Sequence, residues 1–510
     1  MTDDLLLGID VGTTNIKALV FDLRGVCVSA ASTATLVERP HPGWADHDPH
    51  ILWQAVVDVI RRALAPLDNP QRVRGVAIAS FGEAGVLVDA HGAPVAPVIA
   101  WYDRRTAPYV QRWNVQGDPL ETFRLTGMLP VPIYGVFKLQ WLRDHAAEGY
   151  AAATTWLHVA DYIAFRLCGA RATDYSLASR SMLFDLHARR WSDLMIDRAG
   201  LRRDLLPELV ASGTRIGEVT SAAAAVTGLA PGTAVGAGGH DHVCGALAAN
   251  VRRQGDCLDS MGTAEAVLLP LDDFPLDERL FVANAASWTH VTFGVHVARD
   301  RYYAMDGLFS SGAAVEWLRG LIAPGAPLLE ASAEVETLAA ATPPGSMGVL
   351  FLPHLSAGER GAFAGLTAGS GRAALARAVY EGLAFEWRHM LEHIEGMLGV
   401  HAATIRVIGG GTRLPVWLGI KADVLGRPLQ VLDMDESVAL GAALLGGIAA
   451  GVYRDEDEAV GALQIRERTV APNDAAHTQY ERIYRRAFLR LAPALAPVHT
   501  ALDGLESETL

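Results

Sequence analysis

The segment that most constrains the fold is a strand–turn–strand unit at the start of the chain, which recurs halfway along it. Residues 8–22, GIDVGTTNIKALVFD, run from an apolar stretch through Asp10 into a Gly-Thr-Thr turn and then resume an apolar pattern. Residues 256–269 repeat this plan, with a Gly-Thr turn at 262–263 between two apolar strands. Two half-chains that each open with such a hairpin predict two related α/β lobes.

The first hairpin carries the residue types that suit a phosphate and a hydrated metal ion. Gly12 lets the backbone come close to a ligand, and Thr13 and Thr14 offer amides and hydroxyls as hydrogen-bond donors. Asp10 adds a carboxylate that can hold Mg²⁺ through water. The sequence DVGTT, residues 10–14, also fits an ordinary β-turn, so the assignment to phosphate binding depends on the rest of the chain.

Length and charge limit the class of protein. A chain of 510 residues is too long for one core, so two domains of roughly 200–250 residues are expected. We place their boundary near 246–256, which gives domains 1–250 and 251–510. The net charge of −14 argues against a nucleic-acid partner. The long apolar segment 438–453 is too short for a bilayer and is interrupted by glycines, which predicts a packed internal helix and no membrane role.

Cysteine usage and the first residues indicate a compartment. The four cysteines lie far apart and form neither a CxxC pair nor a zinc spacing, as expected for reduced thiols. The acidic N-terminus enters a strand directly and lacks the pattern of a signal peptide. We therefore expect a cytoplasmic protein. The sequence leaves the oligomeric state open, with a homodimer as one option.

Periodicity predicts alternating strands and helices around the two hairpins. The predicted helices span 52–64, 138–145, 151–168 and 373–398, and the predicted strands include 73–80, 85–89, 99–101, 231–237, 256–261 and 404–408. The common nucleotide motifs are absent: no GxxxxGK[ST] occurs, and the Gly-x-Gly at 236–238 lacks the third glycine of a dinucleotide fingerprint. An ordinary P-loop NTPase and a Rossmann dehydrogenase are therefore not supported.

Taken in order, several segments resemble the FGGY carbohydrate kinases, within the actin, hexokinase and heat-shock chaperone ATPase superfamily. The matching segments are 8–22 (first phosphate loop), 96–106 (APVIAWYDRRT), 138–145 (KLQWLRDH), 172–191 (ATDYSLASRSMLFDLHARRW), 258–268 (LDSMGTAEAVL, second phosphate loop), 406–428 (RVIGGGTRLPVWLGIKADVLGRP, adenosine region) and 436–446 (ESVALGAALLG). The resemblance implies two actin-like, ribonuclease H-like α/β domains that flank a nucleotide cleft. One departure is Gly135, where the first signature of the family usually has Pro, Ser or Thr.

The resemblance also implies ATP and Mg²⁺ as cofactors. It assigns nucleotide and phosphate binding to Asp10 (also the metal residue), Gly12, Thr13, Thr14, Lys17, Gly262, Thr263, Gly409, Gly410, Gly411 and Thr412. A plain turn is the alternative for the Gly-Thr at 262–263. Only three of the 43 basic residues are lysine, and Lys17, Lys138 and Lys421 all lie in matched segments, which hints that an ammonium matters there. Lys421 and the nearby Asp423 support an adenosine pocket.

Asp241 is the candidate catalytic base. It follows a glycine-rich strand end in GAGGHDHVCG, and the family places its base there. Phosphoryl transfer needs such a residue to orient the acceptor hydroxyl for in-line attack. From spacing alone, a helix N-cap explains Asp241 equally well. The flanking His240 and His242 lack the companions of a metal site, so they either bond the sugar or pack.

Glu83 is the leading candidate for the acceptor pocket, because it stands where glycerol kinases of the family carry a substrate-binding Glu and xylulokinases a Met-His pair. Trp101, Asp103 and Arg104 follow at the next strand end, and Tyr134 is a further candidate for the same cleft. Core packing is the alternative for Trp101, and a structural salt bridge is the alternative for the Asp-Arg pair.

The expected function is ATP-dependent phosphorylation of a primary hydroxyl of a small sugar or polyol, with a pentulose such as xylulose as the first candidate. Gluconate, tetritols and pentitols are alternatives, as is a non-catalytic nucleotide-dependent clamp, against which Asp241 and both phosphate loops argue. The segment PHLSAGERGAFAGL, from Pro353, is similar to a xylulokinase loop but lacks several of its residues. Together with Glu83, this departure weighs against D-xylulose itself.

Overall fold

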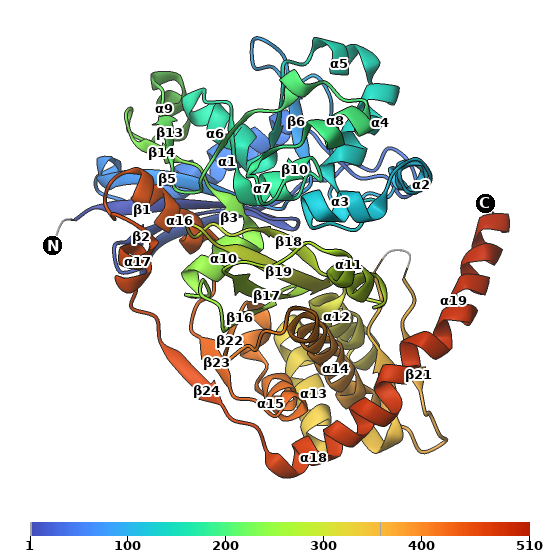
Figure 1. Cartoon of the computed structure of the whole chain (residues 1–510). Helices are drawn as coiled ribbons and strands as arrows, with labels where there is room; N and C mark the ends of the chain where they lie inside the picture. Colours follow the sequence, from blue (N-terminus) through green and yellow to red (C-terminus); the bar gives the residue numbers. More distant parts are fainter. Residues whose placement is uncertain (1–2, 357–358, 510) are drawn as a thin grey trace.

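The computed structural model describes residues 3–356 and 359–509 and places the two hairpins in two separate sheets (Figure 1). The sheet of the first hairpin lies in the blue-to-green half of the chain, and the sheet of the second lies in the green-to-red half. Residues 357 and 358, in the loop that starts at Pro353, fall outside the described residues. Within the described ranges, no helix combines the length and the apolar character needed to cross a membrane.

The first sheet is mixed and is centred on the first hairpin. β1 pairs antiparallel with β2 and parallel with β5, which explains why β1 is buried along its whole length and reads as a continuous apolar run. In order across the sheet the strands are β13 (Arg215–Glu218), β14 (Ala234–Gly236), β5 (Val73–Ser80), β1 (Leu5–Val11), β2 (Asn15–Asp22) and β3 (Cys27–Ala34), with β15 (Gly239–His240) also beside β5.

The second sheet repeats this order and adds one strand at its edge. In both sheets three antiparallel strands are followed by two parallel ones and a last antiparallel one. The strands are β18 (Thr292–Val295), β19 (Tyr302–Leu308), β17 (Glu265–Leu271), β16 (Asp256–Met261), β22 (Thr404–Ile408), β23 (Leu429–Leu432) and β24 (Glu467–Val470). Each hairpin therefore has the same place in its sheet, and the predicted pair of related α/β domains is confirmed.

Helices cover the faces of both sheets (Figure 1). In the first half they are α1 (Pro49–Leu64), α2 (Ala107–Gln116), α3 (Pro119–Thr126), α4 (Gly135–His145), α5 (Ala147–Ala152), α6 (Val159–Cys168), α7 (Tyr175–Ser179), α8 (Asp193–Ala199), α9 (Ser221–Thr227) and α10 (Asp241–Ala248). In the second half they are α11 (Glu278–Ala285), α12 (Ser311–Ile322), α13 (Leu328–Ala341), α14 (Arg372–Leu398), α15 (Pro415–Leu425), α16 (Ser437–Ala449), α17 (Glu456–Gly461), α18 (Asp474–Ile483) and α19 (Leu489–Thr509).

Five two-stranded sheets complete the strand set of the described residues. They are β4 (Asp46–His47) with β7 (Val98–Ile99), β6 (Gly85–Val88) with β8 (Thr155–His158), β9 (Ala172–Asp174) with β12 (Glu208–Val210), β10 (Phe184–Asp185) with β11 (Arg190–Trp191), and β20 (Leu350–Leu352) with β21 (Ala362–Ala364).

Helix α16 comes late in the sequence but packs on the first sheet. A Cβ at Gly8 of β1 would lie 1.7 Å from the carbonyl oxygen of Ala439, and a Cβ at Gly75 of β5 would lie 2.1 Å from that of Gly446. On α16 itself, a Cβ at Gly441 would lie 1.9 Å from the carbonyl oxygen of residue 244 in α10. Only glycine permits such backbone contact. The glycine-interrupted apolar segment is thus the packed internal helix that the sequence predicts.

The predicted strands 73–80, 256–261 and 404–408 match β5, β16 and β22. Two predictions were wrong. The single helix predicted over 151–168 is interrupted by β8, because the β-branched and aromatic residues of Thr155–His158 pair with β6. The strand predicted over 99–101 does not join the main sheet, because β7 pairs with β4.

Candidate active site

Two carboxylates from different elements meet in the first domain. Burial raises the pKa of Asp10, on β1, to about 7, and repulsion by Asp241 adds to that rise. Burial also raises the pKa of Asp241 to about 7. Neighbouring carboxylates with raised pKa values concentrate negative charge, which a bound cation would offset.

Asp241 is the first residue of α10, and His240 occupies the N-cap position, so the N-cap interpretation of Asp241 is wrong. Its Oδ1 accepts a hydrogen bond of 2.7 Å from the backbone N–H of His242 and lies 3.3 Å from Nε2 of His240. The side chain is 22% exposed, so a ligand can reach it, and the N-terminus of α10 favours its charged form.

Glu83 is buried and has φ 66°, a left-handed conformation that a non-glycine residue adopts at a cost of about 1–3 kcal/mol. The carboxylate is held by Arg180, whose Nε donates to Oε1 at 2.6 Å. The same guanidinium donates from Nη1 to Oγ1 of Thr292 at 3.0 Å, on strand β18 of the second sheet. Arg180 therefore joins Glu83 to the other domain.

Sequence reasoning missed Arg180, although it lies inside the matched segment 172–191. The only signal is a lone arginine between two serines in a run that is otherwise buried. Burial lowers the pKa of the two neighbouring histidines, and the positive charge of Arg180 lowers it further. The pKa of His242 is therefore about 4, and that of His240 lies well below 6.5. Both imidazoles are uncharged near neutral pH. They can therefore exchange hydrogen bonds with hydroxyl groups, and Nδ1 of His240 is buried with no partner among the described residues.

Trp101 connects the acceptor side to the first hairpin. Its Nε1 donates to Oγ1 of Thr13 at 2.8 Å, and its ring lies 5.5 Å from that of Phe309 in the second domain. Lys138 holds the backbone at Trp101. Its buried Nζ donates hydrogen bonds to the carbonyl oxygen of Ile133 and, at 3.5 Å, to that of Trp101. Burial lowers the pKa of Lys138 to about 8. Core packing alone does not describe Trp101.

The carboxylate of Asp103 has a structural partner. It is buried and accepts from the backbone N–H of Ala45 at 2.6 Å and from Nε of Arg105 at 3.0 Å. Nη2 of Arg105 also donates to Asp46 at 2.7 Å. A structural salt bridge, the alternative to acceptor binding for Asp103, is thus made with Arg105, and Arg104 is exposed.

The departure at Gly135 has a steric cause. A Cβ at Gly135 would lie 2.6 Å from the ring of Trp156, so any side chain there would displace the indole. Tyr134, one residue earlier, is buried with its ring 5.7 Å from the guanidinium of Arg180. The structure thus places Tyr134 beside the Glu83–Arg180 pair.

The second hairpin presents Gly262 and Thr263 as exposed residues between β16 and β17. The start of α12 lies directly against them, because the N–H of Ala313 donates to the carbonyl of Thr263 at 3.2 Å. A Cβ at Gly312 would lie 2.3 Å from the carbonyl oxygen of Gly262. This helix N-terminus beside the turn was also missed by sequence reasoning. Its signal is a Ser-Ser-Gly step before an apolar helix.

The glycine run 409–411 packs against the second hairpin. Gly409 has φ 94°, and a Cβ there would lie 2.6 Å from the carbonyl oxygen of Met261. A Cβ at Gly411 would lie 2.7 Å from Cε of the same methionine, and Oγ1 of Thr412 donates to the carbonyl of Gly409 at 2.7 Å. The structure therefore brings the segment assigned to adenosine next to the segment assigned to phosphate.

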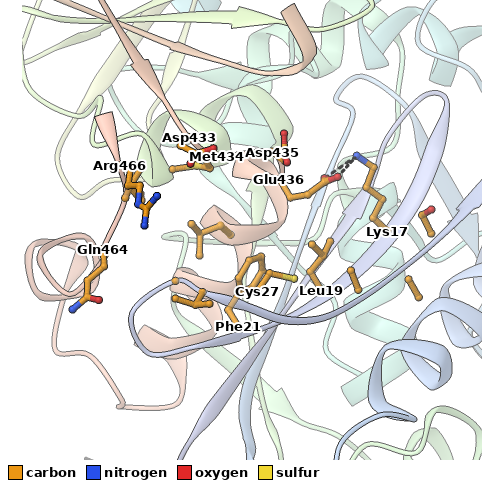
Figure 2. Close-up of a pocket in the computed structure, with 17 residues that line it drawn as sticks. Lys17, Leu19, Phe21, Cys27, Asp433, Met434, Asp435, Glu436, Gln464 and Arg466 are labelled. Carbon is orange, nitrogen blue, oxygen red and sulfur yellow. Dashed lines mark hydrogen bonds and ion pairs between the residues drawn. The ribbon is translucent and has the colours of Figure 1, made fainter. Parts of the chain in front are cut away.

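Lys17 forms an ion pair across the two halves of the chain. Its Nζ lies 2.7 Å from Oε2 of Glu436, just before α16 (Figure 2). Figure 2 shows this pair at one side of a cavity of about 580 Å³, lined by β2, β3 and residues 433–436 and 464–466. Lys421, in contrast, is completely buried in the second domain and contacts Asp259 and Glu265. It does not line an adenosine pocket directly.

No group of three or more histidines, cysteines, aspartates or glutamates that could hold a metal occurs in the ranges 3–356 and 359–509. A magnesium site built from one or two carboxylates, water and substrate phosphates does not require such a group. Asp10 with Asp241 fits this second kind of site.

Comparison with known proteins identifies the family. Residues 5–248 match the N-terminal domain of the FGGY family of carbohydrate kinases, and residues 258–450 match its C-terminal domain. The glycerol kinase of Gloeobacter violaceus is 32% identical over 472 residues, which is 90% of this chain and 91% of that protein. The glycerol kinase of Bordetella parapertussis is 31% identical and covers 95% of this chain and 96% of its own length.

Solved structures give the same result. A xylulose kinase from Rhodospirillum rubrum superposes with a TM-score of 0.87 at 30% identity, over 97% of this chain and 100% of that one. A gluconate kinase from Lactobacillus acidophilus has the same fold, with a TM-score of 0.88 at 22% identity over 98% and 99% of the two chains. Because both domain profiles match and relatives above 30% identity span nine-tenths of the sequence, this chain belongs to the FGGY family and is a carbohydrate kinase.

Proposed function

We propose that this kinase transfers the γ-phosphoryl group of ATP to a primary hydroxyl of a small sugar or polyol. A pentulose such as xylulose is the first candidate acceptor. A short polyol such as glycerol is the second, because Glu83 occupies the acceptor side of the cleft and glycerol kinases are among the relatives at about 31% identity. The observation that carries the proposal is the cluster of Glu83, Arg180 and two uncharged imidazoles around Asp241.

Asp241 is the proposed catalytic base. A carboxylate with a pKa of about 7 is about half deprotonated near neutrality and is basic enough to accept a proton from the attacking hydroxyl. Its position at the start of α10, accessible from the cleft, lets it orient that hydroxyl toward the γ-phosphorus. The backbone and hydroxyl groups of Thr13, Thr14, Gly262 and Thr263 then steady the transferring group.

Asp10 is the proposed metal residue. Its burial, its raised pKa and the repulsion from Asp241 are the properties of a carboxylate that lacks a compensating cation. Asp10 and Asp241 would hold Mg²⁺ through water, and the bound ion would supply positive charge to offset the charge that develops on the phosphates. Lys17 lies on the neighbouring strand and lowers the pKa of Asp10, while Glu436, with which Lys17 forms an ion pair, raises it.

Glu83 is the proposed acceptor ligand. One carboxylate oxygen is held by Arg180, which leaves the group fixed in orientation and able to accept hydrogen bonds from acceptor hydroxyls. The left-handed backbone at Glu83 is strain of the kind that clusters at binding sites. The uncharged His240 and His242 supply further donors and acceptors without adding charge.

Closure of the cleft is part of the proposal, with 1–250 and 251–510 taken as the two lobes. The contacts Trp101–Phe309 and Arg180–Thr292 both cross between them, so acceptor binding and lobe position are linked. Closure would exclude water, which is otherwise a competing phosphoryl acceptor.

A screen of pentuloses, pentitols, tetritols, glycerol and gluconate tests the acceptor class. With the best acceptor found, Glu83→Gln is expected to raise its KM by about tenfold, since a lost hydrogen bond to a charged group costs about 1.5–3 kcal/mol, while the KM for ATP is unchanged. Glu218→Gln removes a surface carboxylate and serves as the matched control, with both KM values unchanged. ATP turnover that no acceptor stimulates would support the clamp alternative instead.

A further inference from the structure

Three charged side chains form a closed cluster behind the second hairpin. Lys421 of α15 contacts Asp259 of β16 and Glu265 of β17 through Nζ, and all three side chains have no solvent exposure. The ring of Trp387 lies 4.7 Å from the same Nζ and covers the ammonium on another side. Lysine is rare in this chain, which otherwise uses arginine, and it is very rarely fully buried without such partners.

Glu265 connects this cluster to a third element. Its second carboxylate oxygen accepts a hydrogen bond of 2.6 Å from Oγ of Ser311, the first residue of α12. Glu265 is itself the first residue of β17, two positions after Thr263. One side chain thus joins the helix next to the glycine run (α15), the helix N-terminus beside the turn (α12) and the strand that leaves the turn.

Stability alone does not explain the cluster. Taking two carboxylates and one ammonium out of water costs several kcal/mol per ion, and apolar side chains of similar size often replace such groups without loss. Burial raises the pKa of Asp259 well above its ordinary value, and Oδ1 of Asp259 has no partner among the described residues. What charged groups add over apolar ones is fixed geometry, because their hydrogen bonds are directional.

We propose that Lys421, Asp259 and Glu265 are positioning residues that fix the Gly262–Thr263 turn relative to α12 and α15. The inference rests on the proposed role of that turn in binding the phosphates of ATP. A turn that moves by even 1 Å would meet the phosphates in the wrong place, at a cost of up to about 10²-fold in rate. The residues proposed to bind the acceptor, Glu83, His240 and His242, lie in the first domain, so loss of the cluster is expected to affect ATP binding more than acceptor binding.

Lys421→Met tests the proposal, since it keeps the length of the side chain and removes the ammonium. The KM for ATP is expected to rise about tenfold while the KM for the acceptor stays within about twofold. Titration calorimetry should show weaker binding of a non-hydrolysable ATP analogue but unchanged binding of adenosine, which has no phosphate. A purely structural role would lower the melting temperature without this separation of ligands.

Arg377→Met is the matched control. Arg377 is another buried cation of the second domain, paired with Glu381 and bonded to Tyr480, and neither partner belongs to the hairpin. This variant is expected to lower the melting temperature and leave both KM values unchanged. If Lys421→Met does not fold, Ser311→Ala tests the proposal in its place. This variant removes one hydrogen bond to Glu265, so it should raise the KM for ATP about threefold.

The outcomes separate the two proposals. Wild-type binding of the ATP analogue in both Lys421→Met and Ser311→Ala would overturn the positioning role and leave the proposed function intact. Wild-type protein that binds neither the analogue nor adenosine would refute the proposed function, and the positioning role with it.

Discussion

The two Gly-Thr hairpins share a place in their sheets but orient their carboxylates in opposite directions. In the first hairpin the acid is Asp10, two residues before the turn glycine. In the second, Asp259 stands three residues before the glycine and Ser260 occupies the position that corresponds to Asp10. Because side chains alternate along a strand, this shift of one residue turns the carboxylate from one face of the sheet to the other.

The carboxylates of the two hairpins therefore have different surroundings, and we expect them to have different roles. Asp10 lies with Asp241, and the pKa of each is raised to about 7. Asp259 lies on the interior face, where Lys421 contacts it. Asp10 and Asp241 keep some solvent exposure, whereas Asp259 has none and is paired with Lys421, so we expect chemistry from the first pair and a structural role for Asp259. The following experiments test that distinction.

Asp241→Asn is expected to have the largest effect. It removes the proposed base while keeping the size of the side chain, so kcat should fall by about 10²–10⁴-fold. Binding of the ATP analogue and the melting temperature should change little. A variant that turns over near the wild-type rate would exclude Asp241 from the mechanism. It would also weaken the proposal that Asp10 and Asp241 act in the chemistry.

Asp10→Asn should follow, with kcat lowered by about 10²-fold and saturation at a higher Mg²⁺ concentration, because the side chain facing the phosphates loses its charge. The matched variant in the second hairpin is Asp259→Asn, whose Mg²⁺ dependence should equal that of the wild type. Equal shifts in both variants would show that the two hairpins do not differ in the way described.

The pH profile gives a smaller effect. A base must be deprotonated to act, and the pKa of Asp241 is about 7, so kcat/KM for the acceptor should fall about tenfold per pH unit below about 7 and level off above it. Asp241→Asn should lose the part of this slope that Asp241 contributes and keep the part due to Asp10, whose pKa is also about 7. A wild-type profile that is flat from pH 5 to 8 would contradict the assignment.

Ser260→Ala should have the smallest effect, at most about twofold on kcat and on either KM, as for substitutions outside any special site. It removes the side chain that stands where the first hairpin has Asp10. A large change in Mg²⁺ dependence would mean that the second hairpin also contributes to the metal site.

Local signals made the hairpins and Asp241 predictable from the sequence. Turn glycines, an apolar run of fixed length and a carboxylate at a strand end all lie within a few residues of one another. The same holds for β5 and β22, whose bounds were predicted as the structure has them. The role proposed for Asp241 rests additionally on the resemblance, since a cap and a base look alike in one sequence.

Long-range pairing was not predictable. The partner of Glu83 is Arg180, 97 residues away, and no periodicity connects them. Asp103 has adjacent arginines at 104 and 105, and only the turn of the backbone selects the second. Lys421 was linked to an adenosine pocket because it lies in the segment that resembles the adenosine region. Since α15 is apolar on most of its surface, the sequence does not show that the ammonium of Lys421 points into the interior.

The contact between α16 and the first sheet has a consequence for biosynthesis. The face of β1 and β5 that this helix covers stays open until about residue 449 has left the ribosome, long after the rest of the first domain has been made. Gly8 and Gly75 leave room on this face for the backbone of α16, which arrives last. A nascent or truncated chain that ends near residue 250 would therefore expose an apolar sheet face, and a chaperone or aggregation would compete for it.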